Sequence, residues 1–268
     1  MYSGTTLRTK SGRVIGAHQR IDRIAKRRLR QLVGPSLKFP TIKDILYFEG
    51  KNGPDGIKSK SPGKDEPWHF IDPYHEGDHS FFDTINDHIA NLGAALRSDN
   101  MERAAFEAGW LAHAITDGLT PAHHYPFEEH LEQIRGEGLH TRSSKKGKVI
   151  MPGKTKSQQL KNNWDFWGSK GVMSTHLGFE LGVATAIPAG KFGDIDISDE
   201  MIRQVEAGDY EAVFRQLLKD VANLHMYEAY MVRGWSSRLA RQTTTVLIPH
   251  IVQAVTLGWY AGICEAKR

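Results

Sequence analysis

Residues 109–125, GWLAHAITDGLTPAHHY, predict a helix that carries ionisable side chains into the interior of the protein. An α-helix turns once in about 3.6 residues, so His113 and Asp117 lie on one face. Their neighbours are mainly apolar, which indicates a helix buried nearly all round. The helix is predicted to end at Gly118, and His123 follows in the next turn. The spacing H-x3-D-x5-H therefore brings three ionisable groups to one end of a buried helix.

Two interpretations of these residues stay open. Buried charge is tolerated when it is paired or when it coordinates a metal ion, so His113 and Asp117 form either a hydrogen-bonded pair or part of a metal site. The only cysteine is Cys264, which excludes an internal disulfide and a thiolate-rich metal site. The chain has 13 histidines. Any metal would therefore be held by imidazole and carboxylate groups.

Composition indicates an ordinary globular protein. The chain has 268 residues, of which 40% are hydrophobic and 25% charged, and no linker that would divide it into two domains is visible. The chain has 35 lysines and arginines against 31 aspartates and glutamates, and the sequence pI is near 9.0. This mildly basic balance fits an anionic substrate or a phosphate-bearing surface but selects neither.

The N-terminal sequence bears on localisation. Residues 1–13 are polar, and we expect a flexible segment there. They lack the apolar core of a signal peptide, and no run of about 18 apolar residues follows. The chain as given is therefore expected to be cytoplasmic, and to be secreted if a leader was removed.

The rest of the chain has the apolar spacing of helices. We expect helices within residues 14–33, 78–96, 127–135, 171–187 and 197–267. Strand-like alternation is hard to find, so the sequence predicts a single-domain, all-α helical bundle over residues 14–268. Residues 51–67 are rich in glycine, proline and lysine and are predicted to be a surface loop without helix. Residues 136–161 are predicted to be a mobile, polar, basic loop, either a flap near an anionic substrate or an insertion without a role.

Five short motifs occur in a distinctive order. They are GAHQRI with His18, GPDG with Asp55, WHFIDP with His69, HAITDGLTPAH, and HLGFE with His176 and Glu180. The last pair repeats the one-turn spacing of His113 and Asp117. In this order the motifs resemble those of the zinc-dependent bacterial phospholipases C and, more distantly, of the zinc-dependent single-strand nucleases that share their all-α fold. The resemblance runs from about residue 14 to the C-terminus, and HAITDGLTPAH is its most specific part.

The resemblance implies two or three zinc ions in a cleft. Imidazole and carboxylate are suitable zinc ligands, and a catalytic site leaves a position open to water or substrate. Asp55 would also orient or deprotonate the attacking water. The ligands implied are Asp55, His69, His113 and Asp117 for one ion; His123, His176 and Glu180 for a second; and His18 with a bridging Asp117 for a third.

The activity implied is hydrolysis of a phosphodiester, with metal-activated water attacking phosphorus in line. The expected substrate is a phospholipid or another phosphodiester, and a phospholipase of this kind would contact the membrane surface peripherally. Two alternatives remain open: a single-strand nuclease that binds nucleic acid through its basic loop and its tryptophans, and a non-catalytic binding protein that metal ions stabilise.

The N-terminus departs from the family pattern. Enzymes of the family complete the third zinc site with the amino group and carbonyl oxygen of an N-terminal tryptophan. This chain has seventeen residues before His18 and no tryptophan among them. Unless the N-terminus is processed, we expect the third site to be incomplete, weak or filled by water.

Overall fold

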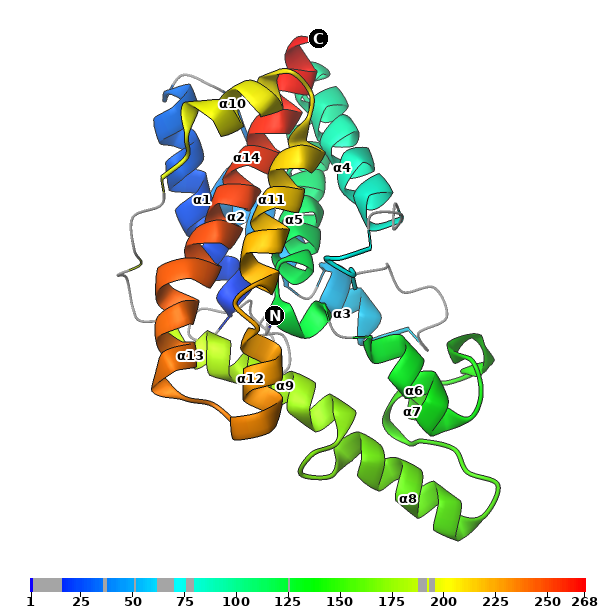
Figure 1. The fold of residues 1–268 in the computed structure, drawn as a ribbon. Coiled ribbons are helices and arrows are strands. Elements are labelled where there is room, and N and C mark those ends of the chain that lie inside the picture. The colour runs from blue at the N-terminus through cyan, green and yellow to red at the C-terminus, as the bar shows by residue number, and fades with distance from the viewer. Residues whose placement is uncertain are drawn as a thin grey trace.

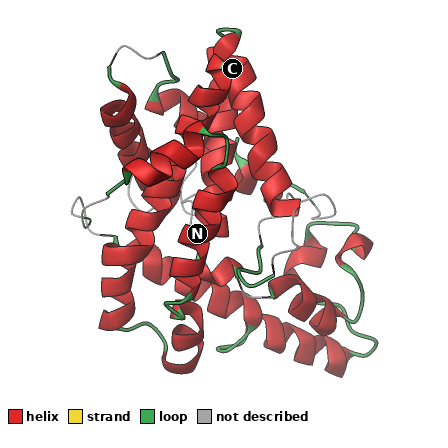
Figure 2. Ribbon diagram, turned by 45° about the horizontal axis from the view of Figure 1, so that its top comes forward, coloured by secondary structure: helices red, strands yellow, loops and turns green. Residues whose placement is uncertain are grey.

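Helices make up the whole regular structure of the described chain. The computed structural model describes residues 1, 16–35, 38–50, 52–61, 70–75, 80–124, 126–187, 192 and 196–268. These residues contain α-helices, short 3-10 turns and one π-helical turn but no strand, as Figure 2 shows. The all-α prediction is confirmed.

The C-terminal helix α14 (Ile248–Lys267) is the centre of the bundle. It packs against α1 (Ala17–Val33), α4 (Ser80–Arg97), α5 (Met101–Gly118) and α11 (Tyr210–Ala222), and Figure 1 shows these helices side by side. Trp259 on α14 is fully buried, and its indole nitrogen donates a 2.9 Å hydrogen bond to the carbonyl oxygen of Ala108. A buried indole needs such a partner, so this bond fixes α14 against α5.

Glycines let the bundle helices approach closely. A Cβ atom on Gly258 would lie 2.6 Å from Cδ1 of Ile115, and one on Gly262 would lie 2.6 Å from Cδ2 of Leu92. Both distances are below contact distance, so a larger residue at either position would require the Ile115 or Leu92 side chain to shift. The close approach holds α5, which carries the central motif, rigidly in the bundle.

The helical stretch Ser237–Lys267 is long and apolar enough to cross a membrane by length and composition alone. It runs through α13 (Ser237–Gln242), a π-helical turn at Thr243–Leu247 and α14. However, 83% of its most apolar window is buried inside the protein. Other helices already cover its apolar surface, as expected of a central core helix.

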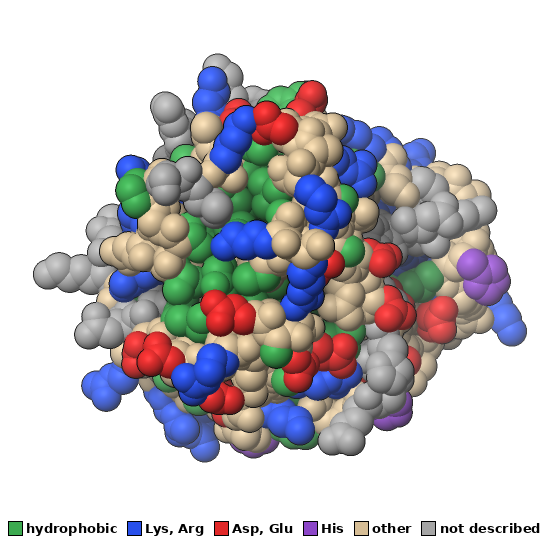
Figure 3. All heavy atoms as spheres, turned by 90° about the horizontal axis from the view of Figure 1, so that it is seen from above, with side chains coloured by type: hydrophobic (Ala, Val, Ile, Leu, Met, Phe, Trp, Pro, Cys, Tyr) green, Lys and Arg blue, Asp and Glu red, His purple; other side chains and the backbone are tan. Residues whose placement is uncertain are grey.

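At the end of the bundle near the C-terminus, arginine side chains donate hydrogen bonds to backbone carbonyl groups. Arg97 of α4 donates to the carbonyl oxygen of Glu265 at 2.6 Å, and Arg268 donates to that of Glu206 at 3.0 Å. Arginines thus satisfy carbonyl groups at the ends of α14 and α10 (Asp199–Glu206), which have no partner within their own helices. Figure 3 shows this face, where hydrophobic side chains gather near the centre and charged side chains of both signs surround them.

Two segments differ from the sequence prediction. Residues 51–67 were expected to contain no helix, but α3 (Pro54–Lys58) forms there, because Pro54 takes the first helical position where its missing N–H is harmless. Residues 136–161 were expected to be a mobile loop, but they contain a 3-10 turn, the short helix α7 (Lys146–Val149) and the start of α8 (Lys156–Trp167). The hydroxyl of Thr155 accepts from the backbone N–H of Gln158 and caps α8.

The remaining elements connect the bundle to its lower end. Residues 127–135 form a helix as predicted, and the helix predicted at 171–187 is confirmed with slightly shorter bounds. These elements are α2 (Ile42–Glu49), the 3-10 turn Pro121–His123, α6 (Phe127–Arg135), α9 (Val172–Ala186), α10 (Asp199–Glu206) and α12 (Met226–Arg233).

A small second core lies outside the bundle, between α6 and α8. Phe127, Leu131, Met151 and Phe166 pack there with Phe70, separately from the large core around α14. In Figure 1 α6, α7 and α8 extend away from the bundle at its lower end. We call this part of the chain, residues 126–170, the α6–α8 module.

Candidate metal centre

Six of the predicted ligands come from four separate elements at the lower end of the bundle. His18 lies in the first turn of α1, and His113 and Asp117 lie one turn apart on α5. His123 lies in the 3-10 turn after α5, and α9 carries His176 and Glu180. All six side chains are buried. The tertiary fold therefore brings residues up to 162 positions apart in sequence into one buried region.

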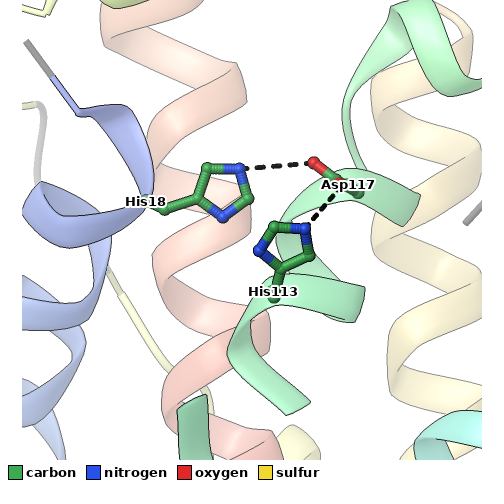
Figure 4. Close-up of side chains that lie close together, drawn as sticks. All are labelled: His18, His113 and Asp117. Atoms are coloured by element: carbon green, nitrogen blue, oxygen red, sulfur yellow. Dashed lines mark ion pairs between the residues drawn. The ribbon is translucent and has the colours of Figure 1, made fainter. Parts of the chain in front are cut away.

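The first cluster consists of His18, His113 and Asp117. Nε2 of His113 lies 3.1 Å from one carboxylate oxygen of Asp117, and Nε2 of His18 lies 3.3 Å from the other. Figure 4 shows the two imidazole rings turned toward this carboxylate from different helices. One potential ligand atom from each residue lies within 4.8 Å of the others, so the three groups can share an ion.

The second cluster consists of His123, His176 and Glu180. Nε2 of both histidines lies 3.0 Å from the same oxygen of Glu180, and their ligand atoms also lie within 4.8 Å of one another. Nε2 of His123 is 3.8 Å from Oδ1 of Asp117. Asp117 therefore faces both clusters, the position expected of a bridging carboxylate.

The α-amino group of Met1 lies between the two clusters. It is 2.5 Å from Oδ1 of Asp117 and 3.0 Å from Oε1 of Glu180. The Met1 carbonyl oxygen lies 2.8 Å from Nε2 of His18. The sequence predicted that, unless the N-terminus is processed, the third zinc site is incomplete, weak or filled by water. Metal binding by the Met1 groups stays a prediction. Residues 2–13 of the predicted flexible segment lie outside the described residues.

The other two predicted ligands are Asp55 and His69. Asp55 on α3 places Oδ1 3.8 Å from Nε2 of His113, and its side chain is 29% exposed, against 5% for Asp117. Asp55 is thus the more accessible of these two carboxylates. His69 lies outside the described residues, so its predicted place beside Asp55 stays a prediction.

Glu49, at the end of α2, is a site residue that sequence reasoning missed. Its Oε1 lies 2.8 Å from Nδ1 of His18 and 2.9 Å from Nδ1 of His113, and the side chain is fully buried. A carboxylate on Nδ1 fixes the orientation of each ring and leaves Nε2 facing Asp117, as in carboxylate–histidine–metal sites. Glu49 ends an ordinary amphipathic helix and belongs to none of the five motifs, so nothing in the sequence marked it.

The electrostatics of the first cluster favour positive charge on the imidazoles. Burial by itself lowers the pKa of His18, but Glu49 and the hydrogen bond to Asp117 together outweigh burial and raise the pKa to about 9. Burial is likewise outweighed at His113, whose pKa Glu49 and Asp117 raise well above its ordinary value. Asp22, one turn after His18, has its pKa raised by burial and by Glu49. The raised pKa disfavours a second negative charge beside Glu49.

In the second cluster, the pKa of His123 is lowered instead of raised. Burial lowers the pKa of His123 to about 4, so its imidazole is neutral near pH 7. Burial opposes ionisation of Glu180, but the Met1 ammonium and His176 hold its pKa well below the ordinary value. A neutral imidazole beside an ionised carboxylate is the form in which these groups bind metal.

A cavity of 660 Å³ opens against His123. Among the described residues that line it there is no lysine or arginine. Four carboxylates and four aromatic rings contribute to its wall: Asp72, Glu128, Glu129, Glu228, Phe70, Tyr74, Phe127 and Tyr227. One member of the second cluster, His123, therefore lines a cavity whose wall combines aromatic and carboxylate side chains.

The donor set fits zinc by its chemistry. Every group is an imidazole nitrogen, a carboxylate oxygen or a terminal amine, all of which zinc accepts. The buried Nδ1 of His176 has no hydrogen-bond partner within the described part of the chain, and its Nε2 faces Glu180. Nearly every buried polar atom in a native protein has a partner, so this nitrogen calls for a group that the described residues do not supply.

Comparison with known proteins adds no relative. No family model matches the sequence, and no curated protein or solved structure matches the chain.

Proposed function

We propose that this protein is a zinc-dependent phosphodiester hydrolase similar to the zinc-dependent phospholipases C. The observation that carries the proposal is that two buried His/Asp/Glu clusters meet at Asp117, beside a cavity that opens on His123. The order of the five motifs supports the same assignment. The helical fold is compatible with the proposal but does not by itself indicate an activity.

The residues of the two clusters would hold the zinc. His18, His113, Asp117 and Asp55 surround one region, and His123, His176 and Glu180 the other. When bound, zinc polarises phosphoryl oxygens and makes a bound water acidic enough to attack at neutral pH. The amino group of Met1 offers a further nitrogen between Asp117 and Glu180, so the N-terminal residue supports a third ion despite the missing tryptophan.

Asp55 is suited to handle the proton of the attacking water. Burial raises its pKa, but His113, Lys58 and His18 together outweigh burial and hold the pKa below the ordinary value, so the carboxylate is ionised. It is also more accessible than Asp117. An ionised, accessible carboxylate at the edge of the site can accept a proton on Oδ1 and keep the water oriented.

The cavity favours a lipid substrate over a nucleic acid. Its described lining has four carboxylates and no lysine or arginine, so a polynucleotide would be repelled where it approached His123. An apolar cavity with acidic walls instead accepts a phosphodiester whose alcohol is neutral or cationic, because aromatic rings and carboxylates attract ammonium groups. This lining supports the phospholipase hypothesis over the nuclease alternative.

Zinc content and hydrolysis test the proposal together. Zinc-loaded protein is expected to hydrolyse phosphatidylcholine to a phosphorylated head group, and to act much more slowly on single-stranded DNA. His176→Ala is expected to lower the zinc content by one ion per chain in elemental analysis. Asp117→Asn is expected to reduce turnover on the order of a thousandfold while the helical circular dichroism persists.

His250→Ala is the matched control. His250 lies on α14, and its Nδ1 faces only the carbonyl oxygen of Val246 at 3.0 Å. This variant should keep the zinc content and the turnover of the wild type. The proposal fails if the wild-type protein binds no zinc, or if Asp117→Asn retains wild-type turnover.

A further inference from the structure

Helix α8 turns an apolar stripe outward instead of inward. Leu160, Trp164 and Trp167 follow at helical spacing on one face, and their side chains are 74%, 69% and 41% exposed. The opposite face carries the buried residues Asn162 and Phe166, and Phe166 packs in the small core. The packing of α8 in the small core therefore does not involve this apolar stripe.

A neighbouring segment extends the stripe into a patch. Val149 and Ile150 are 53% and 49% exposed. The indole nitrogen of Trp167 donates to the carbonyl oxygen of Val149 at 2.7 Å, and the Asn163 amide bonds both backbone groups of Met151. These bonds hold the segment alongside α8. We call the five exposed side chains Val149, Ile150, Leu160, Trp164 and Trp167 the α8 patch.

The charge around the α8 patch is predominantly positive. Between residues 138 and 170 six lysines are exposed, at positions 145, 146, 154, 156, 161 and 170, and Asp165 is the only acidic residue. The whole chain carries a net charge of only +4, so this segment is much more basic than the rest of the protein. Helices with an apolar stripe and flanking lysines bind at membrane interfaces that carry anionic lipids.

We propose that the α8 patch and its lysines dock the protein on an anionic lipid surface. Tryptophan is favoured at the boundary between head groups and acyl chains, and the aliphatic side chains of Val149, Ile150 and Leu160 bury in the same layer. Nucleic acid explains the patch less well, because aliphatic side chains do not stack on bases. A second copy of this chain would place the same lysines against one another, which disfavours a symmetric dimer.

The docking surface connects directly to the candidate metal centre. Phe127 of the α6–α8 module packs at 5.4 Å from Phe70 and at 5.3 Å from His176, measured between ring centroids. Phe127 also lines the cavity that opens on His123. Docking through this module would thus bring the cavity close to lipid. The proposal does not depend on hydrolysis, because the patch and the lysines stand without the metal centre.

Vesicle flotation with the full chain tests the proposal. The wild type is expected to float with vesicles of phosphatidylcholine and phosphatidylserine, and less so in high salt. Leu160→Ser with Trp164→Ser should weaken this binding at least about tenfold. Lys154→Ser, Lys156→Ser and Lys161→Ser together should weaken it on the order of a hundredfold and leave binding to pure phosphatidylcholine unchanged.

Matched controls separate the patch from general exposure and charge. Val232→Ser removes an apolar side chain that is 80% exposed on α12, outside the patch. Arg27→Ser, Lys43→Ser and Lys267→Ser together remove three exposed basic groups elsewhere. Both controls should bind vesicles like the wild type, and all variants should keep the helical circular dichroism, because every changed side chain is exposed.

Three results would overturn the proposal. These are wild-type protein that does not float, patch variants that float like the controls, and tighter binding of a single-stranded oligonucleotide that the same variants abolish. A dimer that dissociates in the patch variants would assign the patch to self-association instead. Flotation is measured without turnover and without zinc, so a failure of the hydrolase proposal leaves this test intact.

Discussion

The large core around α14 and the small core of the α6–α8 module differ in which side chains are buried and which are exposed. The large core surrounds buried ionisable groups such as Glu49 and Asp117, whereas the small core leaves Leu160 and Trp164 exposed. Holding buried charges in register requires a rigid, closely packed scaffold. A five-residue core cannot supply that rigidity, but it can hold an amphipathic helix at the surface. Precise chemistry and surface contact are thus assigned to different parts of one chain.

The largest expected effect compares two phenylalanines that are both fully buried, Phe214 in the large core and Phe166 in the small one. Phe214→Ala should lower the free energy of unfolding by about 3–5 kcal/mol, and all helices should lose protection in hydrogen exchange together. Phe166→Ala should accelerate exchange in α8 and leave α14 protected. Equal loss of protection in α14 by both variants would show that the module is not a separate cooperative unit.

The next effect concerns buried carboxylates within the large core. Glu49→Gln should weaken zinc binding about tenfold to hundredfold, because Glu49 orients two proposed ligands. Glu107→Gln is the matched control: Glu107 is equally buried on α5, but it contacts His88 and Arg103, away from the clusters. Competition with a chromogenic chelator measures the affinity. Equal effects of the two substitutions would mean that Glu49 acts only through stability.

A smaller effect is expected at Met1. One glycine added before Met1 should displace the α-amino group from Asp117 and Glu180 and weaken one zinc site at least about tenfold. One glycine added after Arg268 serves as the control, because that residue is exposed. Zinc titration by calorimetry counts the sites and their affinities. Identical titrations of the two extended chains would exclude the amino group from the site.

The smallest expected effect concerns Lys26, a partly buried charge outside the candidate metal centre. Burial, and next the neighbouring Arg30, lower the pKa of Lys26 to about 8, while its Nζ lies 4.1 Å from the centroid of the Phe39 ring. The unfolded chain holds this proton up to a pKa of about 10.4, so the folded state binds protons less tightly and is penalised below pH 8. Lys26→Met should therefore raise the melting temperature at pH 7, and the gain should shrink as pH rises from 8 to 10. A gain independent of pH would assign the effect to packing.

Helical periodicity predicted the fold class well because each long helix here carries its own apolar stripe. The end of α5 at Gly118 and the bounds of α6 follow from local signals in this way. Composition misled the prediction where tertiary contacts compensate for poor helix formers. Pro54 begins α3 although residues 51–67 look like a loop, and the Asn163 amide orders residue 151 within a segment expected to be mobile.

Spacing along single helices determined the site pairs. His113 with Asp117 and His176 with Glu180 are recognisable from the sequence, because residues four apart on a helix always share a face. The sequence by itself also fixed the helical class and the imidazole and carboxylate chemistry of any metal site.

Only the tertiary structure joined those pairs at Asp117, added Glu49 and the amino group of Met1, and turned the stripe of α8 outward. The physical reason is that local spacing sets which side chains share a face. What that face meets depends on how distant helices pack, and no local pattern records such packing.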